Sequence, residues 1–77
     1  MLRMENTLRV RRAERHVSQL EVAQALTKRG VKISQSRYWQ IENGHVEPTE
    51  EEQDALAEFF GTQRHVVFPP ASAAVQR

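Results

Sequence analysis

Residues 34–43 carry the side chains best suited to hydrogen bonding with a ligand. Ser34 is a favourable helix N-cap, and helical spacing from there turns Tyr38 and Ile41 inward. The outward side of the same helix carries two amides and a hydroxyl, from Gln35, Ser36 and Gln40. Glutamine can form two hydrogen bonds with the major-groove edge of adenine, and serine can donate to or accept from several bases. Amides and a hydroxyl on one helix face are chemically suited to base edges, which makes these three side chains candidates for contact with DNA bases.

No other pattern in the chain is typical of catalysis or of metal binding. There is no cysteine, and the histidines stand singly without metal-ligand spacing, at His16, His45 and His65. The sequence contains no glycine-rich phosphate loop, no nucleophile elbow and no carboxylate pair in a predicted cleft. We therefore expect a protein that is not an enzyme and that uses no cofactor or metal.

Length and composition limit the class of protein. A chain of 77 residues has room for one domain, and the lack of cysteine excludes disulfides and fits a reducing cytosol. The N-terminus lacks the pattern of a signal peptide, and no apolar stretch approaches the ~20 residues needed to cross a bilayer. We expect a cytoplasmic protein without membrane contact.

Charge is distributed unevenly, although the formal net charge is only +1. Residues 1–40 contain nine Lys and Arg against three acids, which gives +6, whereas residues 41–77 contain two against seven, which gives −5. A basic half is suited to phosphate, so this polarity supports a nucleic-acid partner.

Capping residues locate two further helices. Ser18 begins one through a capping box with Glu21, and Thr49 begins another through a capping box with Glu52. Apolar positions at helical spacing follow both caps: Val22, Ala23 and Leu26 after the first, and Leu56, Ala57 and Phe60 after the second.

The remaining segments complete the predicted fold. A helix is expected over residues 7–15, and residues 63–68 form either a short turn or an extended arm. The core side chains of the first helix would be Leu8 with Ala13 or Val10. Because no segment alternates like a strand, we predict an all-α, compact four- to five-helix bundle over residues 1–68, with residues 69–77 as a flexible C-terminal tail.

Two serine-capped helices joined by a glycine-containing connector are the organisation of a helix-turn-helix. Here the sequence resembles the Cro/lambda-repressor-like family, also called the XRE family, of bacterial and phage regulators. The resemblance runs from about Leu8 to Val67. It rests on Arg12, Ser18-Gln19-Leu20-Glu21-Val22-Ala23, Ser34-Gln35-Ser36-Arg37-Tyr38-Trp39-Gln40-Ile41-Glu42-Asn43-Gly44, Pro48 and Gly61, all in register.

The resemblance implies a lambda-repressor-like DNA-binding domain whose helix at residues 34–43 enters the major groove of double-stranded DNA. It implies a transcriptional regulator, most often a repressor. Phosphate contacts are expected from Gln19, Arg37, Asn43 and Lys32, although Arg37 can instead read guanine. Arg12 and Glu42 are expected to form a structural ion pair that ties the first helix to the recognition helix.

The chain departs from the family pattern at several positions. Extra residues around 27–32 predict a longer second helix and a longer loop that lies near the DNA backbone. His16 stands where the family has glycine, and Glu47 stands where it often has a basic residue. Trp39 is outward, and packing against a neighbouring side chain or the DNA backbone is favoured over base reading.

Regulators of this type usually bind as two-fold dimers on half-sites about one helical turn apart. A short apolar run is the candidate dimer seam, and the equal alternative is that it only caps the core: Val66, Val67 and Phe68. Two other functions stay open. One is an antitoxin-like regulator that binds a toxin and its own promoter, and the other is a protein-interaction module that keeps the fold without using DNA.

Overall fold

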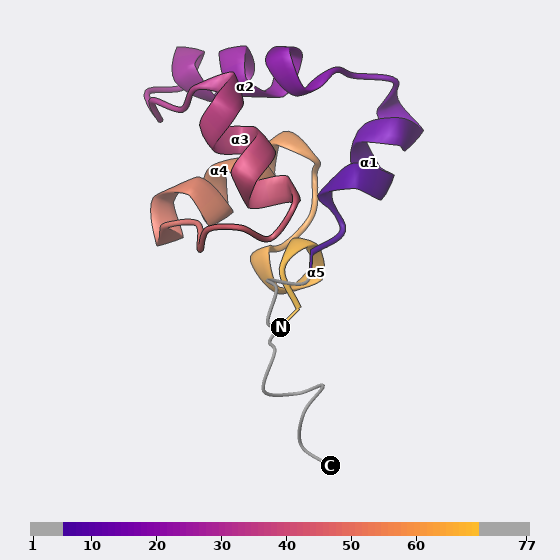
Figure 1. The fold of residues 1–77 in the computed structure, drawn as a ribbon. Coiled ribbons are helices and arrows are strands. Elements are labelled where there is room, and N and C mark those ends of the chain that lie inside the picture. The colour runs from indigo at the N-terminus through magenta and orange to yellow at the C-terminus, as the bar shows by residue number, and fades with distance from the viewer. Residues whose placement is uncertain (1–5, 70–77) are drawn as a thin grey trace.

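The computed structural model describes residues 6–69, and within this range the chain forms five helices and no strand (Figure 1). They are α1 (Leu8–Arg15), α2 (Gln19–Lys28), α3 (Gln35–Glu42), α4 (Glu50–Phe59) and α5 (Arg64–Val67). The predicted all-α fold is confirmed. Of the two alternatives for residues 63–68, the short turn is the correct one, because α5 is helical. No helix within this range is long and apolar enough to cross a membrane. The predicted tail lies outside the described residues apart from Pro69.

Helices α2, α3 and α4 begin where their capping residues place them. The hydroxyl of Ser18 accepts from the Glu21 N–H at 3.0 Å, while the Glu21 carboxylate accepts from the Ser18 N–H at 2.6 Å. Thr49 and Glu52 form the same reciprocal pair. Ser34 accepts from the backbone N–H three residues on, at 3.0 Å. Each cap satisfies N–H groups that have no partner inside the helix.

The hydrophobic core lies between α2, α3 and α4, with α5 packed on α4 (Figure 1). Figure 1 shows α3 crossing the middle of the domain, with α2 on one side and α4 behind it. The largest fully buried side chains are Tyr38, Leu8, Leu26, Ile41, Leu56, Val22 and Val67. Helix α3 thus has one face in the core, which holds its orientation.

Helix α1 is attached mainly by polar contacts. Leu8 is its only buried side chain, while Val10 is 60% exposed and Ala13 is also exposed, so the prediction of a second core residue in α1 is wrong. The Thr7 N–H donates to the Val67 carbonyl at 3.0 Å. Arg15 donates to carbonyls at the end of α4. These bonds take the place of an apolar stripe.

The apolar run proposed as a dimer seam lies mostly inside the domain. Val67 is fully buried, Phe68 is 8% exposed, and Val66 is partly exposed. Val67 and Phe68 belong to the same cluster as the core of α2 and α4. Because their surface is already covered within one chain, the seam prediction is wrong for these two residues, and the core-capping alternative describes them.

The first four helices end in the same way. A residue just past each helix adopts the left-handed conformation, and the N–H of the following residue donates to a carbonyl in the last turn of the helix. Glycine supplies the left-handed residue after α2, α3 and α4. After α1 the residue is His16, with φ 56°, and the Val17 N–H donates to the Arg12 carbonyl at 3.2 Å. It is the one non-glycine residue with positive φ between residues 6 and 69. A side chain in this region costs about 1–2 kcal/mol.

We predict that His16→Gly raises the free energy of unfolding by up to about 1 kcal/mol, because the relief of backbone strain exceeds the added entropy of the unfolded chain. Urea unfolding followed by circular dichroism measures it. The matched control is Glu14→Gly, two residues earlier within the helix, which should lower stability by about 1 kcal/mol. A loss at both positions would contradict the assignment of strain to His16.

Candidate DNA-binding interface

The outward face of α3 presents the residues predicted to read bases. Gln35 and Ser36 are exposed and Gln40 is partly exposed, whereas Tyr38 and Ile41 are fully buried. The predicted orientation of the helix is therefore confirmed. Contact between its outward side chains and DNA stays a prediction.

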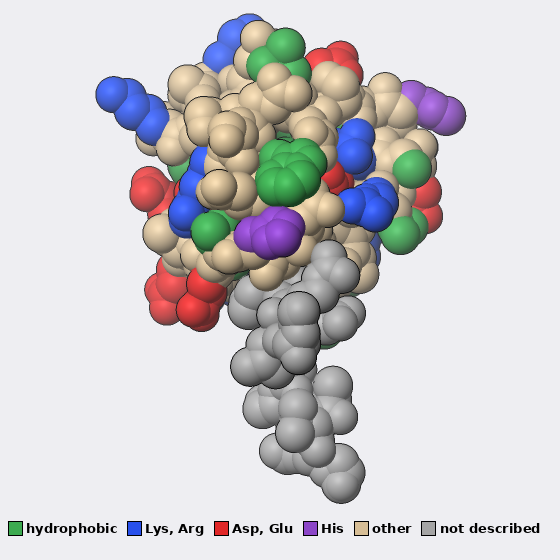
Figure 2. Space-filling model, in the orientation of Figure 1, with side chains coloured by type: hydrophobic (Ala, Val, Ile, Leu, Met, Phe, Trp, Pro, Cys, Tyr) green, Lys and Arg blue, Asp and Glu red, His purple; other side chains and the backbone are tan. Residues whose placement is uncertain are grey.

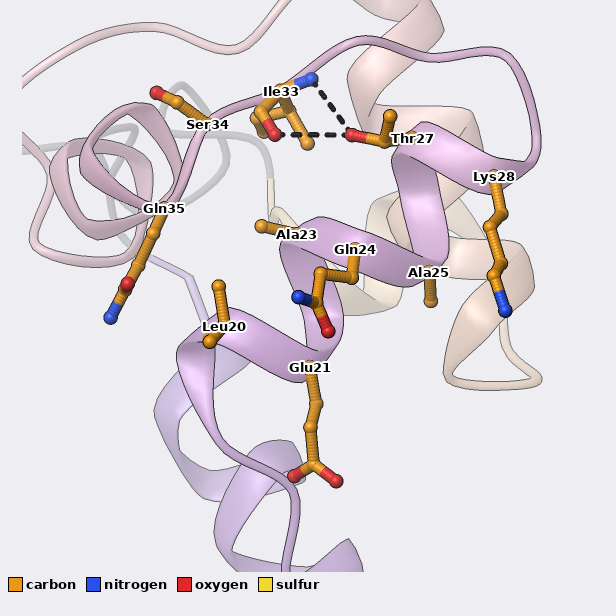
Figure 3. Close-up of a pocket in the computed structure, with 10 residues that line it drawn as sticks. All are labelled: Leu20, Glu21, Ala23, Gln24, Ala25, Thr27, Lys28, Ile33, Ser34 and Gln35. Atoms are coloured by element: carbon orange, nitrogen blue, oxygen red, sulfur yellow. Dashed lines mark hydrogen bonds between the residues drawn. The ribbon is translucent and has the colours of Figure 1, made fainter.

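The start of α3 is held by the connector from α2. The Thr27 hydroxyl donates to the Ile33 carbonyl at 3.2 Å and accepts from the Ile33 N–H at 3.4 Å (Figure 3). The buried Ile33 side chain anchors the segment directly before Ser34. A groove of about 790 Å³ lies between α2 and this connection, and Figure 3 shows Leu20 and Gln35 along it. The first turn of α3 therefore projects beside a hollow.

The carboxylate of Glu42, at the end of α3, accepts three hydrogen bonds from side chains of two other helices. Its side chain has 0% exposure. Arg12 binds it through two nitrogens, Nε to Oε2 at 2.9 Å and Nη2 to Oε1 at 3.2 Å. Gln19 at the start of α2 donates to Oε1 at 2.5 Å. The predicted Arg12–Glu42 pair is present, and Gln19 links α2 to the same carboxylate.

Two further groups lie beside this cluster, the Val17 carbonyl and the side chain of Tyr38. The Arg12 guanidinium donates to the Val17 carbonyl at 3.2 Å, so the same side chain ties down the turn between α1 and α2. Its hydrogen bond to Glu42 raises the pKa of Arg12. The buried Tyr38 hydroxyl has no hydrogen-bond partner among residues 6–69. Burial raises the pKa of Tyr38, and the charges of Glu42 and Arg12 act on it in opposite directions.

Arg37, one of the predicted phosphate contacts, pairs with the Glu52 carboxylate of α4. Its Nη2 donates to Glu52 Oε1 at 2.9 Å and its Nε donates to Oε2 at 3.2 Å. Burial alone would raise the pKa of Glu52, but hydrogen bonds from Arg37 and from the Thr49 backbone outweigh it and lower that pKa. The same pairing raises the pKa of Arg37. This geometry ties α3 to α4, and contact between Arg37 and DNA stays a prediction.

Most arginines of the basic half are engaged inside the domain. Arg15 donates to the end of α4, Arg29 pairs with Glu58 at 3.3 Å, and Arg11 donates to the Thr7 hydroxyl. By contrast, Lys28 and Lys32 are exposed and make no hydrogen bond or ion pair with the part of the chain that the structure describes. The charge polarity of the sequence therefore overstates the positive charge that is open to a partner.

Two of the predicted phosphate contacts have partners within the domain. Gln19 uses its amide for Glu42, as described above. Asn43 donates to the Trp39 carbonyl at 2.9 Å and accepts from Arg9 Nη2 at 2.8 Å. Arg9 was not assigned by sequence reasoning, because its sequence position does not show that α1 passes beside the end of α3. The structure brings it to the edge of the outward face.

Trp39 is the large apolar residue on the outward face of α3. It is 46% exposed, and its ring stacks on that of His45 with centroids 5.3 Å apart and 13° between the planes. Packing against a neighbouring side chain was one of the expectations for this residue, and it is confirmed. Figure 2 shows a hydrophobic side chain and a histidine side by side near the middle of one face, with Lys and Arg side chains on its flanks.

Two capped helices, α2 and α3, joined through residues 29–34 and packed on each other, define a helix-turn-helix. A model described as a helix-turn-helix domain matches residues 6–67, which is more than half of the chain. The chain therefore belongs to the helix-turn-helix domain family, in agreement with the resemblance to XRE-type regulators. No curated protein and no solved structure matches it. Domains of this kind place their second helix in the major groove of DNA.

We predict that Arg12→Met lowers the free energy of unfolding by about 3 kcal/mol, because it leaves the Glu42 carboxylate buried without its cation. The lower end of the usual range applies since Arg12 is 21% exposed. Urea unfolding measures the change. The control is Arg64→Met, which breaks an exposed pair with Asp54 and should cost less than about 1 kcal/mol. Equal losses in the two variants would contradict the role assigned to Glu42.

Proposed function

We propose that this protein is a sequence-specific regulator that binds double-stranded DNA with α3 in the major groove. The observation that carries the proposal is the outward face of α3, where Gln35, Ser36 and Gln40 lie side by side on a helix with a buried opposite face. Two amides and a hydroxyl match the donor and acceptor pattern of base edges in that groove. Because these side chains do not form the core, they are open to a ligand.

Phosphate contacts are proposed on both sides of α3. Lys28, the last residue of α2, and Lys32, two residues before the N-cap of α3, make no internal ion pair with any described residue. Arg9 and Asn43 form a hydrogen-bonded pair at its end. Gln19, at the N-terminus of α2, joins them through the backbone N–H groups of that terminus. These contacts would set the register of α3 in the groove without reading sequence.

We further propose that the protein represses transcription as a dimer on a palindromic operator in the cytoplasm. Helix-turn-helix dimers read two half-sites about one turn of DNA apart. Since Val67 and Phe68 are buried, the dimer contact would use another surface. Selection from random duplex DNA at near-physiological salt tests the proposal directly. A palindromic motif supports it. An enriched single half-site rejects the dimer, and no enrichment by a folded protein favours the interaction module or the antitoxin-like alternative.

We predict that Gln35→Ala combined with Gln40→Ala relaxes sequence preference by about tenfold or more, because each pair of hydrogen bonds to a base contributes about 1–3 kcal/mol of discrimination. Binding to unrelated duplex should change little. Fluorescence anisotropy with the selected operator and a scrambled duplex measures both. Gln63→Ala, at the exposed N-cap of α5, is the matched control. Unchanged preference in the double variant would reject α3 as the reading helix.

We predict that Lys32→Ala makes the fall of log K with log salt concentration less steep, by about 1 in the absolute slope. One phosphate contact and its released counterion are lost. Arg37→Ala should leave this slope unchanged and reduce stability instead, since Arg37 is paired with Glu52. Salt titrations of operator binding compare the two variants. A reduced slope for Arg37→Ala would restore the phosphate contact expected from the sequence.

A further inference from the structure

Trp39 is exposed on the outward side of α3, where the other exposed side chains of that helix are polar. Of the large hydrophobic side chains that are exposed, Val10 is on α1 and Leu20 is on α2, so Trp39 is the one on α3. An indole that is 46% exposed costs free energy in water and is not needed for the core. Polar side chains around one apolar ring fit a ligand that presents hydrogen-bonding groups beside an apolar group.

The Trp39 ring is oriented by one neighbouring ring, and its backbone carbonyl is held by a second contact. It stacks on His45 at 5.3 Å between centroids, and Asn43 donates to the Trp39 carbonyl at 2.9 Å. Asn43 in turn accepts from Arg9 on α1, so the end of α3 is tied to a second helix. A ring that is already oriented loses little conformational entropy on binding. The stack therefore presents a preorganised apolar surface.

The helical spacing places this surface beside the predicted base readers. Trp39 follows Gln35 by four residues, so the two side chains are neighbours along the helix surface. Gln40 is the next residue in the chain. If α3 enters the major groove, the indole faces base edges near those that the two amides contact. This step rests on the function proposed above.

The major groove offers one kind of apolar group at base edges, the methyl on C5 of a pyrimidine. We propose that Trp39 is a specificity-determining residue that packs on a C5-methyl pyrimidine of the binding site, with His45 as its positioning residue. Thymine carries this methyl in ordinary DNA, and 5-methylcytosine carries the same group. Cytosine lacks it, so the contact discriminates between pyrimidines that the amides alone would not separate.

The test uses the 77-residue chain and the selected operator, from which one methyl group at a time is removed. Each thymine of a half-site is replaced in turn by deoxyuridine, which removes only the methyl. At one position the wild-type protein should lose about fourfold in affinity, the factor expected for burying one methyl group. Trp39→Ala should show no loss at that position. A matching loss in Trp39→Ala would overturn the proposal, as would the absence of any sensitive position.

Two further arms separate a contact from a purely structural role. Placing 5-methylcytosine instead of cytosine at the sensitive position should raise wild-type affinity by a similar factor, and no gain would count against a methyl contact. His45→Ala should shrink the uracil effect while Trp39→Phe keeps part of it. An undiminished effect in His45→Ala would reject its positioning role. If Trp39→Ala fails to fold, the comparison of wild type with Trp39→Phe still decides.

The chain has a single tryptophan, so its intrinsic fluorescence reports on Trp39 alone. Operator binding should quench and shift this emission, and unchanged emission on a bound complex would overturn the proposal. Failure of the inference is distinct from failure of the proposed function. A protein that selects an operator but ignores its methyl groups keeps the function and loses the inference, whereas a protein that selects no operator loses both.

Discussion

The buried carboxylate of Glu42 is the constraint on which the arrangement of the first three helices depends. A charge without exposure must be compensated, and Arg12 from α1 and Gln19 from α2 both donate to it. A single side chain at the end of α3 thereby sets the position of two other helices. Since α1 has only one buried residue, this cluster and a few hydrogen bonds to carbonyls carry most of its attachment.

The same constraint leaves the opposite side of α3 available. With Tyr38, Ile41 and Glu42 turned inward, the outward residues are not needed for packing, and they include every side chain that we propose for base contact. Ion pairs hold the helix from two directions, from α1 through Arg12 and from α4 through Glu52. A recognition surface on a rigid element needs less ordering when a ligand binds.

Sequence reasoning located the helices well because their signals are local. Capping boxes at Ser18 and Thr49, the cap at Ser34 and the left-handed glycines act within one turn of the chain, so a short window contains all of the physics. The Arg12–Glu42 pair was expected from the family resemblance, and the structure contains it. The expectation of a second core residue in α1 failed, since Val10 and Ala13 are both exposed, and the choice between core and surface stayed open for Phe68, because contacts between distant segments decide these cases.

The sequence by itself thus determined the all-α class, the extent of α3 and the identity of its outward side chains, because these follow from capping and from the helical period. Only the tertiary structure decided which basic side chains already have partners within the domain. Arg37 pairs with Glu52 and Arg29 with Glu58, while Arg9 lies beside Asn43. Partners fifteen or more residues away cannot be inferred from local pattern, since folding alone brings them within hydrogen-bonding distance. The stacking of Trp39 on His45 likewise depends on how the chain turns after α3, and that turn is what converts an exposed indole into an oriented surface.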